Sequence, residues 1–246
     1  MNLIKMTVAF LLIIFYLFFS YIRFYHYIGD ADLQSPYFGN PILFENSDGE
    51  GSAKYVALGD SLSAGVGSTT VDKTFVYLYA EKLSEKYKQV EILNLAQPGG
   101  TTVDVINNQL PLALIADPEY VTLLIGVNDI HNKRSNNDFN ENFTHIINEL
   151  ISKTNAEILV IEIPYIGSYK IVYPPFNYLL SFRTNQFNKT IYKSVNKFAV
   201  TNRVKVVPIY KETLVYSKDI QGYYSSDLFH PSGEGYLLWG KLINEY

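Results

Sequence analysis

The sequence predicts an α/β protein in which a parallel sheet is covered by helices on both faces. Five short apolar runs rich in strand-forming residues alternate with stretches whose apolar residues recur at helical spacing. Strands that alternate with helices in this way normally become parallel neighbours. The predicted strands are Tyr55–Leu58, Val90–Leu95, Tyr120–Ile125, Glu157–Ile163 and Val204–Ile209. The third is apolar apart from Thr122, as expected of a central strand.

The helices between these strands are predicted from apolar stripes and from capping residues. Thr101 with Asp104 matches a capping box, and Pro111 is expected to interrupt the helix that they begin. Asp138 and Glu141 are expected to cap the next helix. The stripes contain Phe75, Leu78, Tyr79, Leu83 and Tyr87, then Phe139, Phe143, Ile146, Ile147, Leu150 and Ile151, then Phe187, Ile191, Val195 and Phe198, and finally Tyr236, Trp239, Ile243 and Tyr246.

An apolar segment at the N-terminus, Met6–Ile22, is long enough to cross a bilayer core. It is longer than the usual apolar part of a signal peptide, and no Ala-x-Ala site follows closely, which favours an uncleaved anchor. A cleaved signal and a buried core helix are the alternatives. We expect a membrane-anchored protein with its globular part outside the cytoplasm, or a secreted one if the segment is cleaved.

The rest of the chain divides by composition. Residues 1–23 are predicted to be the anchor or signal segment, 24–53 a juxtamembrane stretch and linker, and 54–246 the folded domain. The linker assignment rests on Glu45–Ser52, which is polar and contains two glycines.

Composition excludes several classes of function. The net charge is −4 and there is no basic block, so we expect no nucleic-acid partner. The absence of cysteine excludes disulfides, thiolate metal sites and a cysteine nucleophile. His26, His131 and His145 lack the spacing of metal ligands, so we expect neither a metal nor a cofactor.

Polar residues that could perform acyl transfer follow the predicted strands. Ser61 comes after the first strand, Gly99 after the second and Asn128 after the third, and Asp227 and His230 precede the last helix. The carboxyl ends of parallel strands meet at one edge of a sheet, where ligands bind. A serine nucleophile needs a base, a group that orients the base, and donors for the oxyanion. His230 could be the base and Asp227 could orient it.

Four motifs carry a resemblance to a known family. GDSLS begins at Gly59, the glycine of NLAQPGGTT is Gly99, GVND begins at Gly126, and DLFH begins at Asp227. Their types and order resemble the four blocks of the SGNH, or GDSL-type, esterase and lipase superfamily, from Lys54 to the C-terminus. The resemblance implies a three-layer α/β/α flavodoxin-like fold with a five-stranded parallel sheet in the order 2-1-3-4-5. The α/β-hydrolase motif Gly-x-Ser-x-Gly is absent, because residue 63 is serine.

The same resemblance implies roles for individual residues. Ser61 would be the nucleophile, His230 the base and Asp227 the third member of a triad. The oxyanion hole would use Ser61, Gly99 and Asn128, with Gly100 as the neighbouring alternative to Gly99. Asp60 and Asp129 are interpreted as structural residues that bind loop amides and brace a loop, and His131 as a rim residue.

The predicted activity is hydrolysis of a carboxylic ester, either a small-molecule ester or a lipid ester. An aromatic stretch, residues 165–187, follows the fourth strand and could be a lid or acyl-chain wall, an ordinary helix extension, or a platform for sugar rings. The alternatives are an O-acyltransferase or deacetylase acting on an envelope glycan, and a binding module without catalysis. The membrane is expected as a partner through the N-terminal segment.

Overall fold

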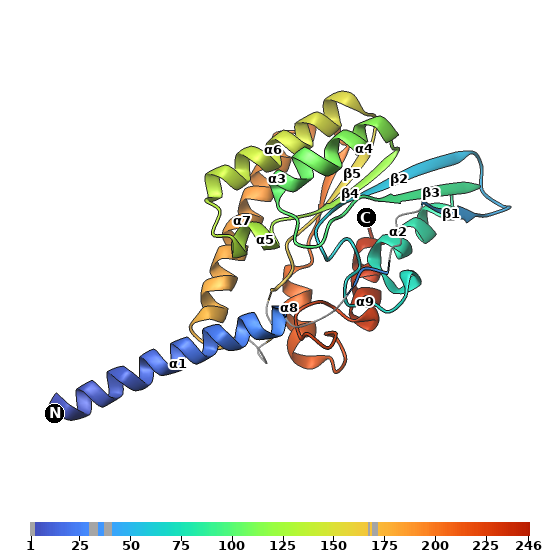
Figure 1. Cartoon of the computed structure of the whole chain (residues 1–246). Coiled ribbons are helices and arrows are strands. Elements are labelled where there is room, and N and C mark those ends of the chain that lie inside the picture. Colours follow the sequence, from blue (N-terminus) through green and yellow to red (C-terminus); the bar gives the residue numbers. More distant parts are fainter. Residues whose placement is uncertain (1–2, 30–33, 37–40, 167, 169–171) are drawn as a thin grey trace.

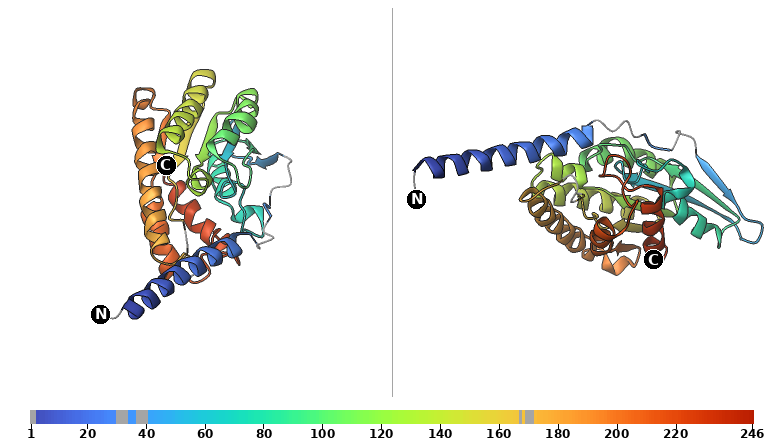
Figure 2. Two further views of the ribbon diagram at one scale, coloured as in Figure 1. Left: turned by 60° about the vertical axis from the view of Figure 1, so that its left-hand side comes forward. Right: turned by 90° about the horizontal axis from the view of Figure 1, so that it is seen from below.

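A computed structural model of the chain describes residues 3–29, 34–36, 41–166, 168 and 172–246. A long helix, α1 (Leu3–Gly29), comes first, and its part Leu3–Arg23 is long and apolar enough to cross a membrane. Most of α1 projects from the domain, and only its C-terminal end lies against it (Figures 1 and 2). The side chains of residues 24–29 and 219 lie outside the described part.

The sheet has six strands in the order β1-β3-β2-β4-β5-β6. The strands are β1 (Ile42–Glu45), β2 (Ser52–Gly59), β3 (Gln89–Asn94), β4 (Tyr120–Leu124), β5 (Glu157–Ile161) and β6 (Val204–Val207). Strands β2 to β6 pair in parallel, which confirms the five predicted strands and their order. In register, Leu58 of β2 lies opposite Leu123 of β4, so the strands end together at the edge where Ser61 follows.

Strand β1 corrects the prediction that residues 24–53 are only a juxtamembrane stretch and linker. Ile42–Glu45 pairs antiparallel with Gln89–Ile92 and covers the outer edge of β3. Asn46 continues this contact, because its N–H donates to the Lys88 carbonyl over 2.8 Å. Ser35 and Pro36 also reach the domain, and the Ser35 hydroxyl donates to the Ala64 carbonyl. The sheet therefore begins at Ile42.

The remaining helices lie in two layers. They are α2 (Phe75–Ser84), α3 (Thr102–Asp104), α4 (Leu110–Ala116), α5 (Val127–His131), α6 (Asn136–Lys153), α7 (Phe176–Asn196), α8 (Tyr210–Asp219) and α9 (Gly233–Ile243), with short 3₁₀ turns at Val71–Lys73 and Ala199–Thr201. Helices α2 and α9 pack together on one face of the sheet, and α4, α6 and α7 cover the other (Figures 1 and 2). This is the predicted three-layer fold.

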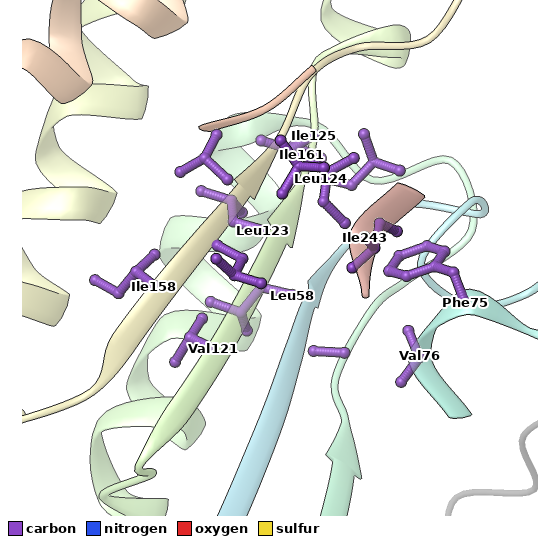
Figure 3. Packing of buried hydrophobic residues seen from close by; sticks show 14 of the residues in the cluster. Leu58, Phe75, Val76, Val121, Leu123, Leu124, Ile125, Ile158, Ile161 and Ile243 are labelled. Atoms are coloured by element: carbon purple, nitrogen blue, oxygen red, sulfur yellow. The ribbon is translucent and has the colours of Figure 1, made fainter. Parts of the chain in front are cut away.

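Buried aliphatic side chains on both faces of the central strands form the core. Leu58, Val121, Leu123 and Ile158 project from β2, β4 and β5, and Phe75 with Val76 of α2 and Ile243 of α9 close one side (Figure 3). A core of this kind holds the strand ends rigidly, so the loops that leave them have fixed starting points.

Several local predictions need correction. Pro111 does not interrupt the helix after Thr101. A π-helical turn, Val105–Gln109, leads directly into α4. In this turn the Leu110 N–H donates to the carbonyl of Val105, which lies five residues earlier. Proline has no N–H, and the wider turn accommodates this loss. The cap of α6 is Ser135, whose hydroxyl accepts from the Asp138 N–H. The capping box at Thr101 and Asp104 is confirmed.

The aromatic stretch and α8 also differ from the sequence interpretation. The second half of the stretch, from Phe176, is the first part of α7, while residues 167 and 169–171 lie outside the described part. Helix α8 was not predicted, because its ten residues, YKETLVYSKD, form no clear apolar stripe.

Candidate active site

Ser61 lies two residues after the end of β2, in a tight loop at the carboxyl edge of the sheet. The turn at Gly59 has φ +147°, and a Cβ atom there would lie 2.2 Å from the Leu124 carbonyl oxygen. Only glycine fits this close approach of the loop to β4. The carbonyl of Ser61 accepts from the Val66 N–H over 2.9 Å, which closes the loop on itself. The serine is therefore held by backbone contacts on both sides.

The side chain of Gln109 fixes the same turn from the opposite side. Its Oε1 accepts from the Gly59 N–H over 2.9 Å, and its Nε2 donates to the Gly59 carbonyl over 2.8 Å. Gln109 is fully buried at the end of the π-helical turn. This contact of Gln109 was not predicted from the sequence. The run of polar residues before Pro111, Asn107, Asn108 and Gln109, did not distinguish this buried glutamine from its exposed neighbours.

His230 joins Ser61 to Asp227. The Ser61 Oγ lies 2.8 Å from His230 Nε2, and His230 Nδ1 lies 2.5 Å from Asp227 Oδ2. The other Asp227 oxygen, Oδ1, accepts from the Ser225 hydroxyl and from the N–H groups of Phe229 and His230. The structure therefore brings the three predicted residues into one hydrogen-bonded chain.

The electrostatics of Asp227 keep it ionised. Burial alone would raise its pKa, but the hydrogen bond and charge of His230, with the donors on Oδ1, outweigh burial and lower the pKa. A carboxylate facing Nδ1 holds the proton of the imidazole on that nitrogen. Nε2 is then the acceptor that faces the Ser61 hydroxyl.

The three residues expected to supply oxyanion donors lie on loops that leave three strands, with Ser61 after β2, Gly99 after β3 and Asn128 after β4. Among the described residues, none accepts from the N–H of Ser61 or of Gly99. The Gly100 N–H, in contrast, donates to the Gln97 carbonyl over 2.9 Å, which favours Gly99 over Gly100 as a donor. The Asn128 Nδ2 donates one hydrogen to the Gly100 carbonyl over 2.9 Å, and this orients its second hydrogen.

Asp129 ties the Asn128 helix to the Gly99 loop. Its carboxylate accepts from the Thr102 N–H over 2.9 Å and from the Thr102 hydroxyl over 2.7 Å. The Arg134 Nε lies 2.8 Å from the same carboxylate. Asp129 is fully buried, so these contacts compensate a charge held away from water. Its predicted role as a loop brace is confirmed.

Asp60 is the second buried acid beside the serine. Its Oδ1 accepts from the Leu62 N–H over 3.0 Å, which confirms its predicted binding to a loop amide. Among the described residues, Oδ2 has no hydrogen-bond partner. Burial first, and then the charge of Asp129, raise the pKa of Asp60 to about 7.

This pKa predicts a pH-dependent contribution to stability. Between its ordinary pKa of 3.8 and about 7, the folded protein holds a proton that the unfolded chain releases. Stability is therefore lost as pH rises through this range, by on the order of 4 kcal/mol at most. Asp60→Asn removes the titration, so the variant should gain stability relative to wild type between pH 4 and pH 8.

Urea unfolding, followed by fluorescence of the single tryptophan, Trp239, measures this difference because the indole is buried. Asp48→Asn, which changes an exposed acid, is the control. Its free energy of unfolding should change with pH in the same way as that of wild type. If the difference in free energy of unfolding between Asp60→Asn and wild type stays constant across this pH range, the raised pKa assigned to Asp60 is wrong.

His131 lies at the end of α5, beside the Asp227–His230 loop. Its ring centroid is 5.7 Å from that of Phe229, which in turn is 5.0 Å from that of His230. Burial, and then the charge of His230, lower the pKa of His131 to about 4. His131 is therefore neutral at neutral pH and presents an uncharged wall next to the site.

Residues 57–238 match the model of the GDSL-like lipase/acylhydrolase family. No curated protein sequence matches the chain.

Solved structures share the fold. A lipase/acylhydrolase from Enterococcus faecalis is 24% identical, with 78% of this chain and 94% of that chain covered and a TM-score of 0.60. A lipolytic G-D-S-L protein from Veillonella parvula is 16% identical, with 78% and 96% covered and a TM-score of 0.61. An acetylxylan esterase from Geobacillus stearothermophilus is 14% identical, with 80% and 94% covered and a TM-score of 0.57.

The family match spans well over half of the chain and includes all four motifs. The fold of the solved structures agrees with it. The chain belongs to the GDSL-like lipase/acylhydrolase family, and it is a hydrolase of the class that cleaves esters.

Proposed function

We propose that this protein hydrolyses carboxylic esters through an acyl-enzyme on Ser61. The observation that carries the proposal is the hydrogen-bonded chain from the Ser61 Oγ through both nitrogens of His230 to Asp227. A serine hydroxyl is a weak nucleophile until a base removes its proton as it attacks. His230 as this base is supported by its Nε2, which lies 2.8 Å from the Ser61 Oγ, and by the buried Asp227 carboxylate that faces its other nitrogen.

In the acylation step, the Ser61 Oγ attacks the ester carbonyl carbon while its proton passes to His230 Nε2. The imidazolium that forms is stabilised by Asp227 on its other nitrogen. The tetrahedral intermediate places a negative charge on the former carbonyl oxygen. The N–H groups of Ser61 and Gly99 and the amide of Asn128 are the donors we assign to this oxyanion.

The intermediate collapses when the alcohol leaves with the proton from His230. Water then attacks the acyl-enzyme, gives its proton to the same nitrogen, and releases the carboxylic acid and the Ser61 hydroxyl. The steps balance without a metal or cofactor. Asp227 needs to change neither its charge nor its position in either half of the reaction.

A panel of p-nitrophenyl esters tests the proposal. Release of p-nitrophenol from acetyl, butyryl, octanoyl and palmitoyl esters is compared between the full chain and Ser61→Ala. Turnover by wild type alone supports the proposal, whereas equal turnover by both proteins, or turnover by neither, counts against it. An added alcohol that captures the acyl group faster than water would identify a transferase instead.

Asn128→Ala should lower kcat for the best ester by roughly 10²- to 10³-fold, because one oxyanion donor is lost. Asn132→Ala is the matched control, since Asn132 is exposed at the end of the same short helix. Circular dichroism checks that both variants fold. An unchanged kcat in Asn128→Ala removes this side chain from the oxyanion site.

We further propose that α1 anchors the protein in a membrane, with the hydrolase domain outside the cytoplasm. The support is the apolar segment Leu3–Arg23, whose side chains are almost all exposed in the folded chain. Exposed apolar surface of this extent is stable only when lipid or another apolar surface covers it. Retention of the full chain in membranes after an alkaline carbonate wash would support anchoring, and its release would contradict it.

A further inference from the structure

We infer that the substrate is a long-chain lipid ester whose acyl chain lies in a cavity walled partly by the membrane helix α1. The inference rests on the proposed ester hydrolysis at Ser61 and specifies its substrate. The cavity has a volume of about 540 Å³, within the range of about 300–1,000 Å³ typical of small-molecule sites. Its walls include Ser20 and Tyr21 of α1, Ile130 and His131 of α5, and Phe176 and Leu180 of α7.

The short helix α5 connects the wall of the cavity to the proposed catalytic site. This five-residue helix carries Asn128 near its start and presents Ile130 and His131 to the cavity at its end. The His131 ring also lies beside Phe229, the residue between Asp227 and His230. An acyl group whose carbonyl oxygen is held at Asn128 can therefore extend its chain along α5 into the cavity.

The charged residues of the cavity wall do not favour an anionic ligand inside. The Arg183 guanidinium donates to the Arg134 carbonyl over 2.7 Å and lies over the Phe187 ring at 5.0 Å. Lys133 is exposed, so its ammonium group remains in water. Both residues then contribute mainly their methylene stems to the wall. The other walls are largely apolar, which suits a hydrocarbon chain.

Helix α1 meets the domain at this cavity. Of its described side chains, Ser20 alone is buried, and its Oγ has no hydrogen-bond partner among the described residues. The Arg23 guanidinium lies over the Tyr173 ring at 5.2 Å, near the start of α7. Figures 1 and 2 show the C-terminal half of α1 passing the lower end of α7. The small serine leaves space where a larger apolar residue would fill the cavity.

The position of Ser20 along α1 places the cavity at the membrane surface. The segment that could cross a membrane ends at Arg23, so Ser20 and Tyr21 lie in its last turn. Lys and Arg side chains at such helix ends favour the membrane interface. A lipid chain could thus pass from the bilayer along α1 into the cavity without crossing water, which identifies bilayer lipids or lysolipids as the ester source.

The test uses the full chain in phosphatidylcholine nanodiscs and compares p-nitrophenyl decanoate with p-nitrophenyl acetate. Filling the cavity from either wall, with Ser20→Trp or Leu180→Trp, should lower the decanoate-to-acetate ratio of kcat/KM by about tenfold or more. This follows because binding of a chain strengthens with each methylene it buries. Ile22→Trp and Phe182→Trp, at exposed sites on the same two helices, are the controls and should keep the wild-type ratio.

A second measurement does not depend on turnover. A decanoyl ester with a diazirine near the end of its chain is irradiated with the Ser61→Ala protein, and the labelled peptides are identified by mass spectrometry. Label on peptides of both α1 and α7 supports the inference. Label confined to peptides outside α1, α5 and α7, or an unchanged ratio in both cavity-filling variants, overturns the acyl site even when Ser61-dependent acetate turnover stands. Absence of any Ser61-dependent turnover in wild type would instead reject the proposed function.

Discussion

Ser61→Ala is expected to reduce kcat/KM for every ester by roughly 10⁴-fold or more, because no other group can take over the nucleophilic attack. The variant should lose catalytic activity but not folding stability. The Ser61 side chain donates its hydrogen bond to His230, while the loop is held by backbone contacts and by Gln109 at Gly59. Removing one oxygen atom leaves those contacts in place. Initial rates with p-nitrophenyl butyrate and the unfolding midpoint measure the two effects separately.

Ser63→Ala is the matched control for this experiment. Ser63 lies two residues further along the same loop, and its hydroxyl donates to the Leu58 carbonyl over 3.1 Å, away from His230. This variant should keep most of the turnover while losing some stability. Turnover in Ser61→Ala within tenfold of wild type would contradict the role assigned to Ser61.

Asp227→Asn has the second largest expected effect, a fall in kcat of about 10⁴-fold. The asparagine Oδ1 can still accept from Ser225, Phe229 and His230, so the loop should keep its shape. Its amide, however, would donate to His230 Nδ1 where the carboxylate now accepts. The imidazole would then carry its proton on Nε2 and could not accept the proton of the Ser61 hydroxyl.

The control for this variant is Ser225→Ala, which removes one donor to Asp227 Oδ1 but leaves the contact of Oδ2 with His230. Its kcat should fall by less than tenfold. Both variants are compared by pH–rate profile and circular dichroism. If kcat falls by less than tenfold in a folded Asp227→Asn protein, the carboxylate does not determine which nitrogen of His230 carries the proton.

Much of the fold and of the candidate site could be predicted because both depend on local patterns. The five parallel strands are continuous apolar runs, and the loops that follow them meet at one edge of the sheet. Ser61 and Asn128 follow strands that end at this edge, so their loops were expected to meet there. The structure joins Ser61, His230 and Asp227 by hydrogen bonds as expected, and their chemical roles stay predictions until the variants are measured.

The features that were not predicted depend on contacts between distant parts of the chain. Residues Ile42–Glu45 are too few for a clear alternating pattern and become a strand because β3 offers an open edge. Gln109 contacts Gly59, which lies 50 positions earlier, and the sequence near either residue does not specify the other. The apolar pattern of α1 predicts a membrane helix but not its contacts with the domain, where Ser20 and Tyr21 line the cavity and Arg23 lies over the Tyr173 ring.

The most direct test of the central claim is covalent labelling of the nucleophile. The full chain is treated with a dialkyl p-nitrophenyl phosphate, which reacts with an activated serine and releases p-nitrophenol, and the adduct is located by peptide mass spectrometry. We expect one dialkylphosphoryl group per chain, on Ser61, with loss of ester turnover in proportion to labelling. We expect no adduct in Ser61→Ala and much slower labelling in Asp227→Asn. An adduct on another residue that tracks the loss of activity, or full turnover after Ser61 is labelled, would contradict the assignment of Ser61 as the nucleophile.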